Sequence, residues 1–162
     1  EKTEEFILKA NAAAYSDQDL VAQFTSVLGP HPRVGALIEQ MTKTHMEPET
    51  YLIHQGARFS DVYFVGSGRV RVEVELPNGK SIRVRKMLAG AVVGEMALYL
   101  EQTRTANVII DVPSHIYALS AADLARLENE DPELAVLFHR LMAGNLAEKL
   151  IVANNVLHLQ QL

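Results

Sequence analysis

The sequence predicts a mainly β fold with flanking helices, of the α+β class: an antiparallel β-roll, a jelly-roll-like barrel, between N-terminal helices and C-terminal lid or hinge helices. Between residues 44 and 119, apolar and polar residues alternate with a period of two, and Gly, Pro and Asn punctuate the stretch. On both sides of it, apolar residues recur at helical spacing. With 48% hydrophobic residues, the 162-residue chain can build one well-packed core.

The first 43 residues are expected to form an N-terminal helical segment. Helical spacing of apolar residues predicts three helices, over residues 3–14, 17–28 and 33–41. Gly29-Pro30 ends the second of them, because proline cannot continue a helix.

The β-roll is expected to occupy residues 44–119. Its strands are predicted near residues 44–46, 51–54, 61–66, 68–76, 79–87, 91–93, 105–112 and 114–119. Pro77-Asn78-Gly79 predicts a tight hairpin turn, since Asn-Gly tolerates the positive φ angles that such a turn requires. The inward faces of this hairpin are assigned to Val70, Val72, Val74, Leu76, Ile82 and Val84.

Residues 120–162 are expected to form C-terminal helices. Ser120 and Asp123 have the spacing of a capping box, which predicts a helix start. A second helix is predicted from Pro132 to the end of the chain, and Gly144-Asn145 would allow it to bend or break. Its second part carries an apolar seam that would pack within the chain or against a second copy. The seam consists of Leu146, Leu150, Ala153 and Leu157.

Composition excludes several classes of function. The formal net charge of −5 disfavours nucleic acid binding by this chain, and the basic residues at 69–86 alternate with apolar ones as on a solvated hairpin face. The absence of cysteine excludes disulfides and thiolate metal sites. No apolar run approaches the roughly 20 residues of a membrane span. A cytoplasmic location is expected, which includes the cytoplasmic domain of a membrane protein, and the first residue, Glu1, suits a fragment of a longer chain.

Residues 93–106 contain the groups of an anion-binding loop. Glu95 and Arg104 lie nine positions apart and are joined by a short apolar stretch. Gly94 lets a ligand approach the backbone, and residues 95–100 can form one or two helical turns whose free amides point at an anion. Arg104 supplies the charged fork that suits a phosphodiester, while Glu95 can accept a hydrogen bond from a ribose hydroxyl.

This segment resembles the phosphate-binding cassette of cyclic-nucleotide-binding domains, which are found in the catabolite activator family, kinase regulatory subunits and cyclic-nucleotide-gated channels. Residues 55–70, with Gly56, Gly66 and Gly68, resemble an earlier glycine-rich motif of the same family. The resemblance implies that Glu95 accepts from the ribose 2′-hydroxyl, that Arg104 pairs with the cyclic phosphate and that Thr105 donates nearby. It implies a ligand-binding set of Gly94, Glu95, Met96, Ala97, Arg104, Thr105 and Ala106.

Two positions depart from the family pattern. Val93 stands where an aromatic residue usually precedes Gly-Glu, and Thr103 where a proline often precedes the arginine. Neither change removes a ligand group, but both would loosen the cassette and lower affinity. The C-terminal helices bear a further resemblance to the cyclic-nucleotide-binding domains appended to sulfate-permease-type transporters.

The leading hypothesis is a regulatory sensor, not an enzyme, that binds a cyclic purine mononucleotide. The ligand is cAMP in preference to cGMP, with cGMP as the alternative, and the signal passes through the C-terminal helices to an effector outside these residues. One alternative is a protein-interaction or dimerisation module that has lost ligand affinity. Another is the sensor half of a transcription regulator. No metal site is predicted, because the six histidines never fall at a close ligand spacing. No catalytic motif is found in the sequence, so no catalytic residue or catalytic cofactor is predicted.

Overall fold

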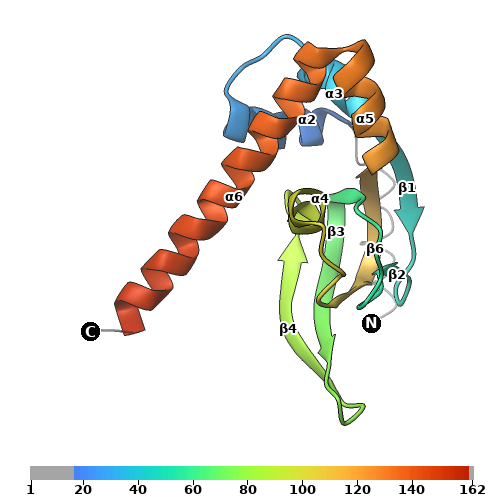
Figure 1. Cartoon of the computed structure of the whole chain (residues 1–162), viewed down its shortest axis with the longest axis vertical. Helices are drawn as coiled ribbons and strands as arrows, with labels where there is room; N and C mark the ends of the chain where they lie inside the picture. Colours follow the sequence, from blue (N-terminus) through green and yellow to red (C-terminus); the bar gives the residue numbers. More distant parts are fainter. Residues whose placement is uncertain (1–16, 161–162) are drawn as a thin grey trace, which may run out of the picture.

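The structure is a computed structural model that describes residues 17–160, so the helix predicted over residues 3–14 lies outside the described residues. Five helices are described: α2 (Asp17–Leu28), α3 (Val34–Glu39), α4 (Glu95–Leu100), α5 (Ala121–Glu130) and α6 (Pro132–Gln160). Six strands are described: β1 (Thr42–Met46), β2 (Tyr51–Ile53), β3 (Val62–Glu75), β4 (Ser81–Leu88), β5 (Val92–Val93) and β6 (Asn107–Leu119). Helices α2, α3, α5 and the start of α6 gather at one end of the sheet, and α6 then extends away from it (Figure 1).

The strands form one antiparallel sheet that does not close into a barrel. Its order is β1-β6-β3-β4, with β2 added to β6 and β5 added to β3. Among the described residues β4 pairs with β3 alone, which leaves its outer edge open. The mainly β fold with flanking helices is confirmed, but the predicted closure of the roll into a barrel is wrong.

The sequence predicts two separate strands in place of each of the two longest strands. Residues 61–66 and 68–76 form the single strand β3, and residues 105–112 and 114–119 form β6. Gly68 and Pro113 meet where the two strands pair, and the register shifts there between Ser67 and Arg69. Gly68 has a φ of +95°, and a Cβ atom on it would overlap the Ser114 side chain. A β-bulge therefore absorbs both residues, and neither strand breaks.

The helices begin and end close to their predicted bounds. Ser120 and Asp123 form the predicted capping box, in which the Asp123 amide donates to Ser120 Oγ over 3.0 Å. Helix α6 continues through Gly144 to Gln160 without a break. No helix within residues 17–160 is long and apolar enough to cross a membrane.

Two hydrophobic clusters hold the fold together. The larger one joins the helices to the end of the sheet, where the rings of Phe24 on α2 and Phe64 on β3 pack edge to face with centroids 4.9 Å apart. The smaller one lies on the sheet and contains Val70 and Val72, as predicted. Ile82 and Val84, by contrast, are about half exposed, because no described helix or strand packs on this part of edge strand β4.

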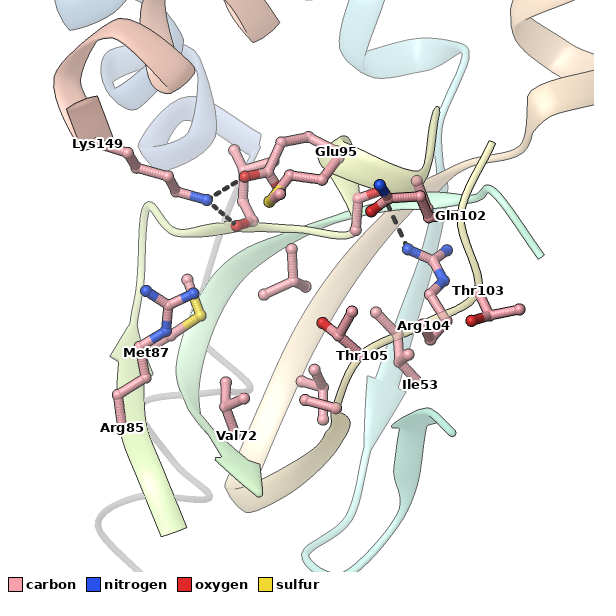
Figure 2. Close-up of a pocket in the computed structure, with 17 residues that line it drawn as sticks. Ile53, Val72, Arg85, Met87, Glu95, Gln102, Thr103, Arg104, Thr105 and Lys149 are labelled. Atoms are coloured by element: carbon pink, nitrogen blue, oxygen red, sulfur yellow. Dashed lines mark hydrogen bonds and ion pairs between the residues drawn. The ribbon is translucent and has the colours of Figure 1, made fainter. Parts of the chain in front are cut away.

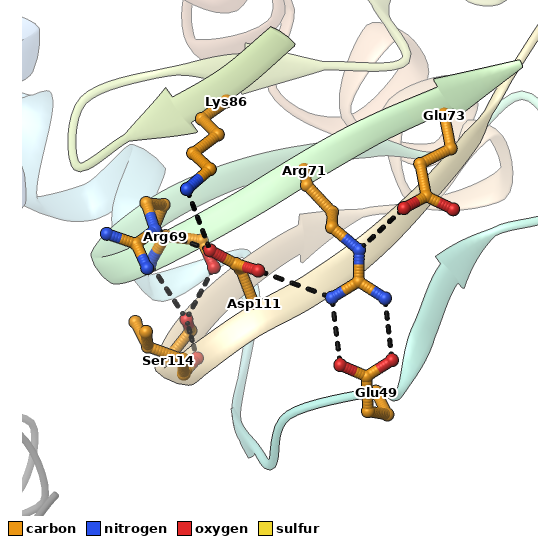
Figure 3. A network of polar contacts seen from close by, with 8 residues as sticks. Glu49, Arg69, Arg71, Glu73, Lys86, Asp111 and Ser114 are labelled. Carbon is orange, nitrogen blue, oxygen red and sulfur yellow. Dashed lines mark hydrogen bonds and ion pairs between the residues drawn. The ribbon is translucent and has the colours of Figure 1, made fainter. Parts of the chain in front are cut away.

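One arginine of the predicted solvated face is buried. Arg71 donates to Glu49 over 2.6 Å, to Glu73 over 2.9 Å and to Asp111 over 3.3 Å (Figure 3). The hydrogen bond from Arg71 lowers the pKa of Glu49.

 The net rise in the pKa of Arg71 comes from the hydrogen bond to Glu49, since desolvation on its own acts in the opposite direction and lowers it. The network ties β3 and β6 to the β1–β2 connection, so the assignment of Arg71 to a solvated face is wrong.

Candidate functional site

Gly94 sets the conformation of the loop between β5 and α4. It precedes the first residue of α4 and has a φ of +91°, a backbone conformation that residues other than glycine rarely adopt. A Cβ atom at this position would lie 2.6 Å from Arg104 Nη1 and 2.7 Å from the Asp61 carbonyl oxygen. Glycine is therefore required here both by the backbone and by the close approach of Arg104. The six residues of α4 then form the predicted helical turns.

Arg104 is held beneath this loop. It is 7% exposed, and its guanidinium donates from Nη1 to the Gly94 carbonyl over 3.1 Å and from Nη2 to the Asp61 carbonyl over 2.7 Å. Its backbone amide donates to the Ala57 carbonyl, and its carbonyl accepts from the Gly56 amide. Burial lowers the pKa of the guanidinium, against the opposing effects of Tyr63, Asp61 and Glu95. Arginine nevertheless stays charged in proteins, so Arg104 is a fixed cation.

These contacts join the two glycine-containing motifs of the sequence. Gly56, Ala57 and Asp61 belong to the earlier motif, residues 55–70, and all three contact Arg104 of the later one, residues 93–106. The earlier motif thus holds Arg104 by hydrogen bonds, and the missing side chain of Gly94 leaves room for its guanidinium.

Glu95 is the second buried charge of the site. It is 4% exposed and forms an ion pair, through Oε1, with Nζ of Lys149 on α6 (Figure 2). Lys149 also donates to the Val92 carbonyl over 3.2 Å. A lysine from the last helix thereby reaches the first residue of the cassette helix.

The seven residues predicted to bind a ligand all line one pocket, whose volume is about 140 Å³. Its floor is apolar and comes from the sheet, with Ile53 on β2, Val72 on β3 and Val108 on β6. Arg85 and Met87 of β4 and Lys149 of α6 line it as well. The structure therefore brings together Gly94, Glu95, Met96, Ala97, Arg104, Thr105 and Ala106.

Sequence reasoning missed the lining residues outside the cassette. The alternation of basic and apolar residues predicts only a solvated face for Arg85, although the alternation along β4 does place residues 85 and 87 on one side of the strand. Lys149 lies 54 positions from Glu95, and no local pattern links the two residues. Only the packing of α6 brings them together.

The pocket combines charge with an apolar floor. Arg104, Lys149 and Arg85 provide positive charge, Glu95 provides a carboxylate acceptor, and Thr105 provides a hydroxyl. These groups suit an anionic ligand that also carries hydroxyl donors and a flat apolar part.

The cyclic nucleotide-binding domain family matches residues 43–131. Glutaminase 1 of Bradyrhizobium diazoefficiens is 39% identical over 93 residues, which make up 57% of this chain and 14% of the glutaminase. The chain thus spans a small part of that relative's length.

Two solved structures share the fold. A cyclic nucleotide-binding domain from Methylobacillus flagellatus superposes with a TM-score of 0.74 at 18% identity, covering 92% of this chain and 88% of that one. The catabolite activator protein of Thermus thermophilus gives a TM-score of 0.67 at 25% identity, covering 86% of this chain and 63% of that one. Since the family match spans more than half of the 162 residues, the chain belongs to the cyclic nucleotide-binding domain family.

Proposed function

We propose that this chain is a regulatory sensor whose pocket binds a cyclic purine mononucleotide, cAMP in preference to cGMP, and that occupancy is passed through α6 to an effector outside these residues. The observation that carries the proposal is the placement of buried Glu95 and buried Arg104 on one pocket at the start and end of the cassette. A buried cation and a buried carboxylate at opposite ends of a loop suit a phosphate and a ribose in one ligand.

The proposed binding mode uses groups that line the pocket. Arg104 has five N–H donors, of which two hydrogen bonds go to carbonyls of Gly94 and Asp61, so further donors remain for a phosphate. The amides at the start of α4 add donors to the same anion. The purine would lie on the apolar floor formed by Ile53, Val72 and Val108. In this mode Thr105 donates its hydroxyl to the phosphate or the base.

Calorimetric titration of the ligand-stripped protein tests the proposal. We expect one molecule of cAMP to bind per chain, cGMP to bind more weakly and linear AMP, which lacks the cyclic diester, to bind weakest. Mass spectrometry of the protein before stripping would identify a ligand carried through purification. If neither cyclic nucleotide binds to folded protein at millimolar concentration, the sensor function is wrong.

A second candidate function is favoured by the surface of α6. Its second part exposes a series of large apolar side chains, and the seam residues Leu150 and Leu157 are each more than half exposed. Within residues 17–160 only Leu146 of this seam is partly buried, and the seam beyond it is not packed against the rest of the chain. The exposed apolar side chains of the segment are Leu150, Ile151, Val152, Val156, Leu157 and Leu159.

These side chains support the alternative of a homodimer through α6, on a fold that need not retain ligand affinity. Sedimentation of the wild type and of a Leu150→Glu/Leu157→Glu variant tests it. A dimer that dissociates in the variant supports the alternative, and a wild-type monomer at all concentrations contradicts it. Nucleotide titration of the same samples tells whether dimer formation and binding occur together.

A further inference from the structure

We infer that Lys149 is a positioning residue of the nucleotide site, which holds Glu95 in place for the ribose and fastens the second part of α6 to the pocket. This inference rests on the proposed function and adds to it a residue outside the cassette. Its basis is the pair of contacts made by one ammonium group, to Glu95 Oε1 and to the Val92 carbonyl (Figure 2).

The burial of Glu95 makes this cation necessary. The Glu95 side chain is 5% exposed, and a buried carboxylate without a partner is strongly unfavourable. Arg104 lies in the same pocket, but its hydrogen bonds go to the carbonyls of Gly94 and Asp61. Within residues 17–160, Lys149 is the cation that forms an ion pair with Glu95.

The geometry leaves Glu95 able to bind a ligand at the same time. Lys149 contacts Oε1, and a carboxylate has a second oxygen with its own lone pairs. Oε2 can accept from a ribose hydroxyl while Oε1 stays paired. Lys149 is itself fixed by the Val92 carbonyl, so it orients the carboxylate as well as neutralising it.

The same contact joins α6 to the site. The buried side chains of α6 all lie between Leu134 and Met142, in its first part. Beyond Gly144, Lys149 connects α6 to the site through its ion pair with Glu95. The side chains from Ile151 to Gln160 are exposed. A ligand that keeps Glu95 in its paired orientation will therefore favour the attached position of α6, and the attached helix will favour the ligand.

Lys149→Met tests the inference, because methionine keeps an unbranched side chain of similar length and removes the charge. We expect cAMP to bind about tenfold more weakly to this variant, in line with the loss of one charged hydrogen-bond partner. Lys149→Arg should restore most of the affinity. Lys80→Met is the matched control, since Lys80 is exposed beside the β-hairpin turn and outside the pocket lining.

A ligand without the ribose hydroxyl separates positioning from general structural support. The Lys149→Met penalty should be clearly smaller for 2′-deoxy-cAMP, because Lys149 acts on that hydroxyl through Glu95. An equal penalty for both ligands overturns the positioning role. Unchanged or tighter cAMP binding by Lys149→Met overturns it too, and tighter binding would show that Lys149 competes with the nucleotide.

Two measurements without nucleotide keep the inference apart from the proposed function. In a double-mutant cycle, Glu95→Gln and Lys149→Met should have non-additive effects on the unfolding free energy. Amide exchange in residues 145–160 should be faster in Lys149→Met than in the wild type or Lys80→Met. Additive effects with unchanged exchange overturn the role of Lys149, whereas a wild type that binds neither cyclic nucleotide overturns the sensor function alone.

Discussion

At the scale of single residues, Gly94 combines two requirements that can be tested separately. Its φ of +91° is strained for any side chain, and a Cβ would also press on Arg104 Nη1. We expect Gly94→Ala to destabilise the fold by about 1–2 kcal/mol and to weaken cAMP binding by about tenfold or more, because Arg104 must move. Thermal unfolding and calorimetry measure the two effects.

Gly79→Ala provides the control for Gly94→Ala. Gly79 has a similar φ of +83° in the β3–β4 hairpin turn, and a Cβ there would meet nothing within 4 Å. It should show the loss of stability from backbone strain without a loss of affinity. Equal affinities of the two alanine variants would contradict the role given to the Gly94–Arg104 contact.

Arg104 carries the proposed phosphate contact. We expect Arg104→Ala to weaken cyclic nucleotide binding by about 2–4 kcal/mol, roughly 30- to 1000-fold, since a charged and partly desolvated contact is lost. Arg104→Lys should restore little, because an ammonium lacks the fork of the guanidinium. Arg58→Ala, at an exposed position, is the control for a change of net charge. Unchanged affinity in a folded Arg104→Ala protein would show that the cassette assignment is wrong.

Glu95 carries the proposed ribose contact. Glu95→Gln should weaken binding by about 1–3 kcal/mol, because an amide oxygen accepts a hydrogen bond less strongly than a carboxylate. The wild type should bind 2′-deoxy-cAMP more weakly than cAMP, and the variant should lose most of this difference. The same difference in both proteins, measured by calorimetry, would mean that Glu95 does not contact the ribose.

At the scale of elements, strands β3 and β6 are joined by the ionic network around Asp111. Burial would raise the pKa of Asp111, but hydrogen bonds from Arg69 over 2.6 Å and Arg71 over 3.3 Å lower it overall. A carboxylate whose pKa is lower in the folded than in the unfolded protein stabilises the fold fully above its unfolded value, near 3.9. That contribution disappears as the pH falls through the folded value.

We therefore expect Asp111→Asn to cost about 1–3 kcal/mol of unfolding free energy at pH 7, by loss of charged hydrogen bonds. The gap between wild type and variant should begin to narrow below about pH 4, where the carboxylate of the unfolded wild type binds a proton, and should close once the folded carboxylate is protonated as well. Denaturant unfolding at pH 7, 5 and 3 measures it, with Glu148→Gln on the exposed side of α6 as control. A gap that is constant with pH would exclude the ionised carboxylate as its cause.

The elements also show which parts of the fold can be predicted from sequence. Helix starts could be located because capping residues act locally, as Ser120 and Asp123 do. Gly68 and Pro113 were misread as strand ends, since a bulge between long strands uses the same residues as a turn. Ile82 and Val84 show that period two marks a strand, while burial depends on what covers that strand.

The same distinction applies to the candidate site. The cassette could be predicted because its seven residues lie within fourteen consecutive positions and all reach one pocket. The residues that surround the cassette could not be predicted in this way. Arg71, buried among carboxylates, and Lys149, paired with Glu95, depend on contacts between distant segments that no local spacing encodes.

At the scale of the whole molecule, α6 links two parts of the structure with different packing. Its first part is buried against α2, α3 and α5, whereas its second part leaves this helical cluster and extends away from the sheet (Figure 1). The exposed second part gains little from packing, so its position depends on few contacts. An element of this kind can change position at low cost when a ligand binds.

The last prediction concerns this segment. Ending the chain after Gly144 keeps all the buried residues of α6, which end at Met142, but removes Lys149. The truncated protein should therefore fold, with a lower stability because Glu95 has lost its ion pair. If the segment acts as a lid over the purine, its removal should raise the dissociation rate of cAMP by about tenfold for each 1.4 kcal/mol of lost contact. Arg104→Ala should still weaken binding to the truncated protein, because the phosphate contact does not depend on the lid. Stopped-flow displacement measures the rate.

Hydrogen exchange in the full chain provides the matching observation. Saturating cAMP should slow exchange in residues 145–160, because the ligand shifts the population toward the arrangement in which α6 is attached to the pocket. Lys149→Met should reduce this slowing, since the ion pair with Glu95 is then missing. Equal exchange with and without nucleotide, together with an unaltered dissociation rate after truncation, would remove α6 from the mechanism and leave the sheet and cassette as the whole binding unit.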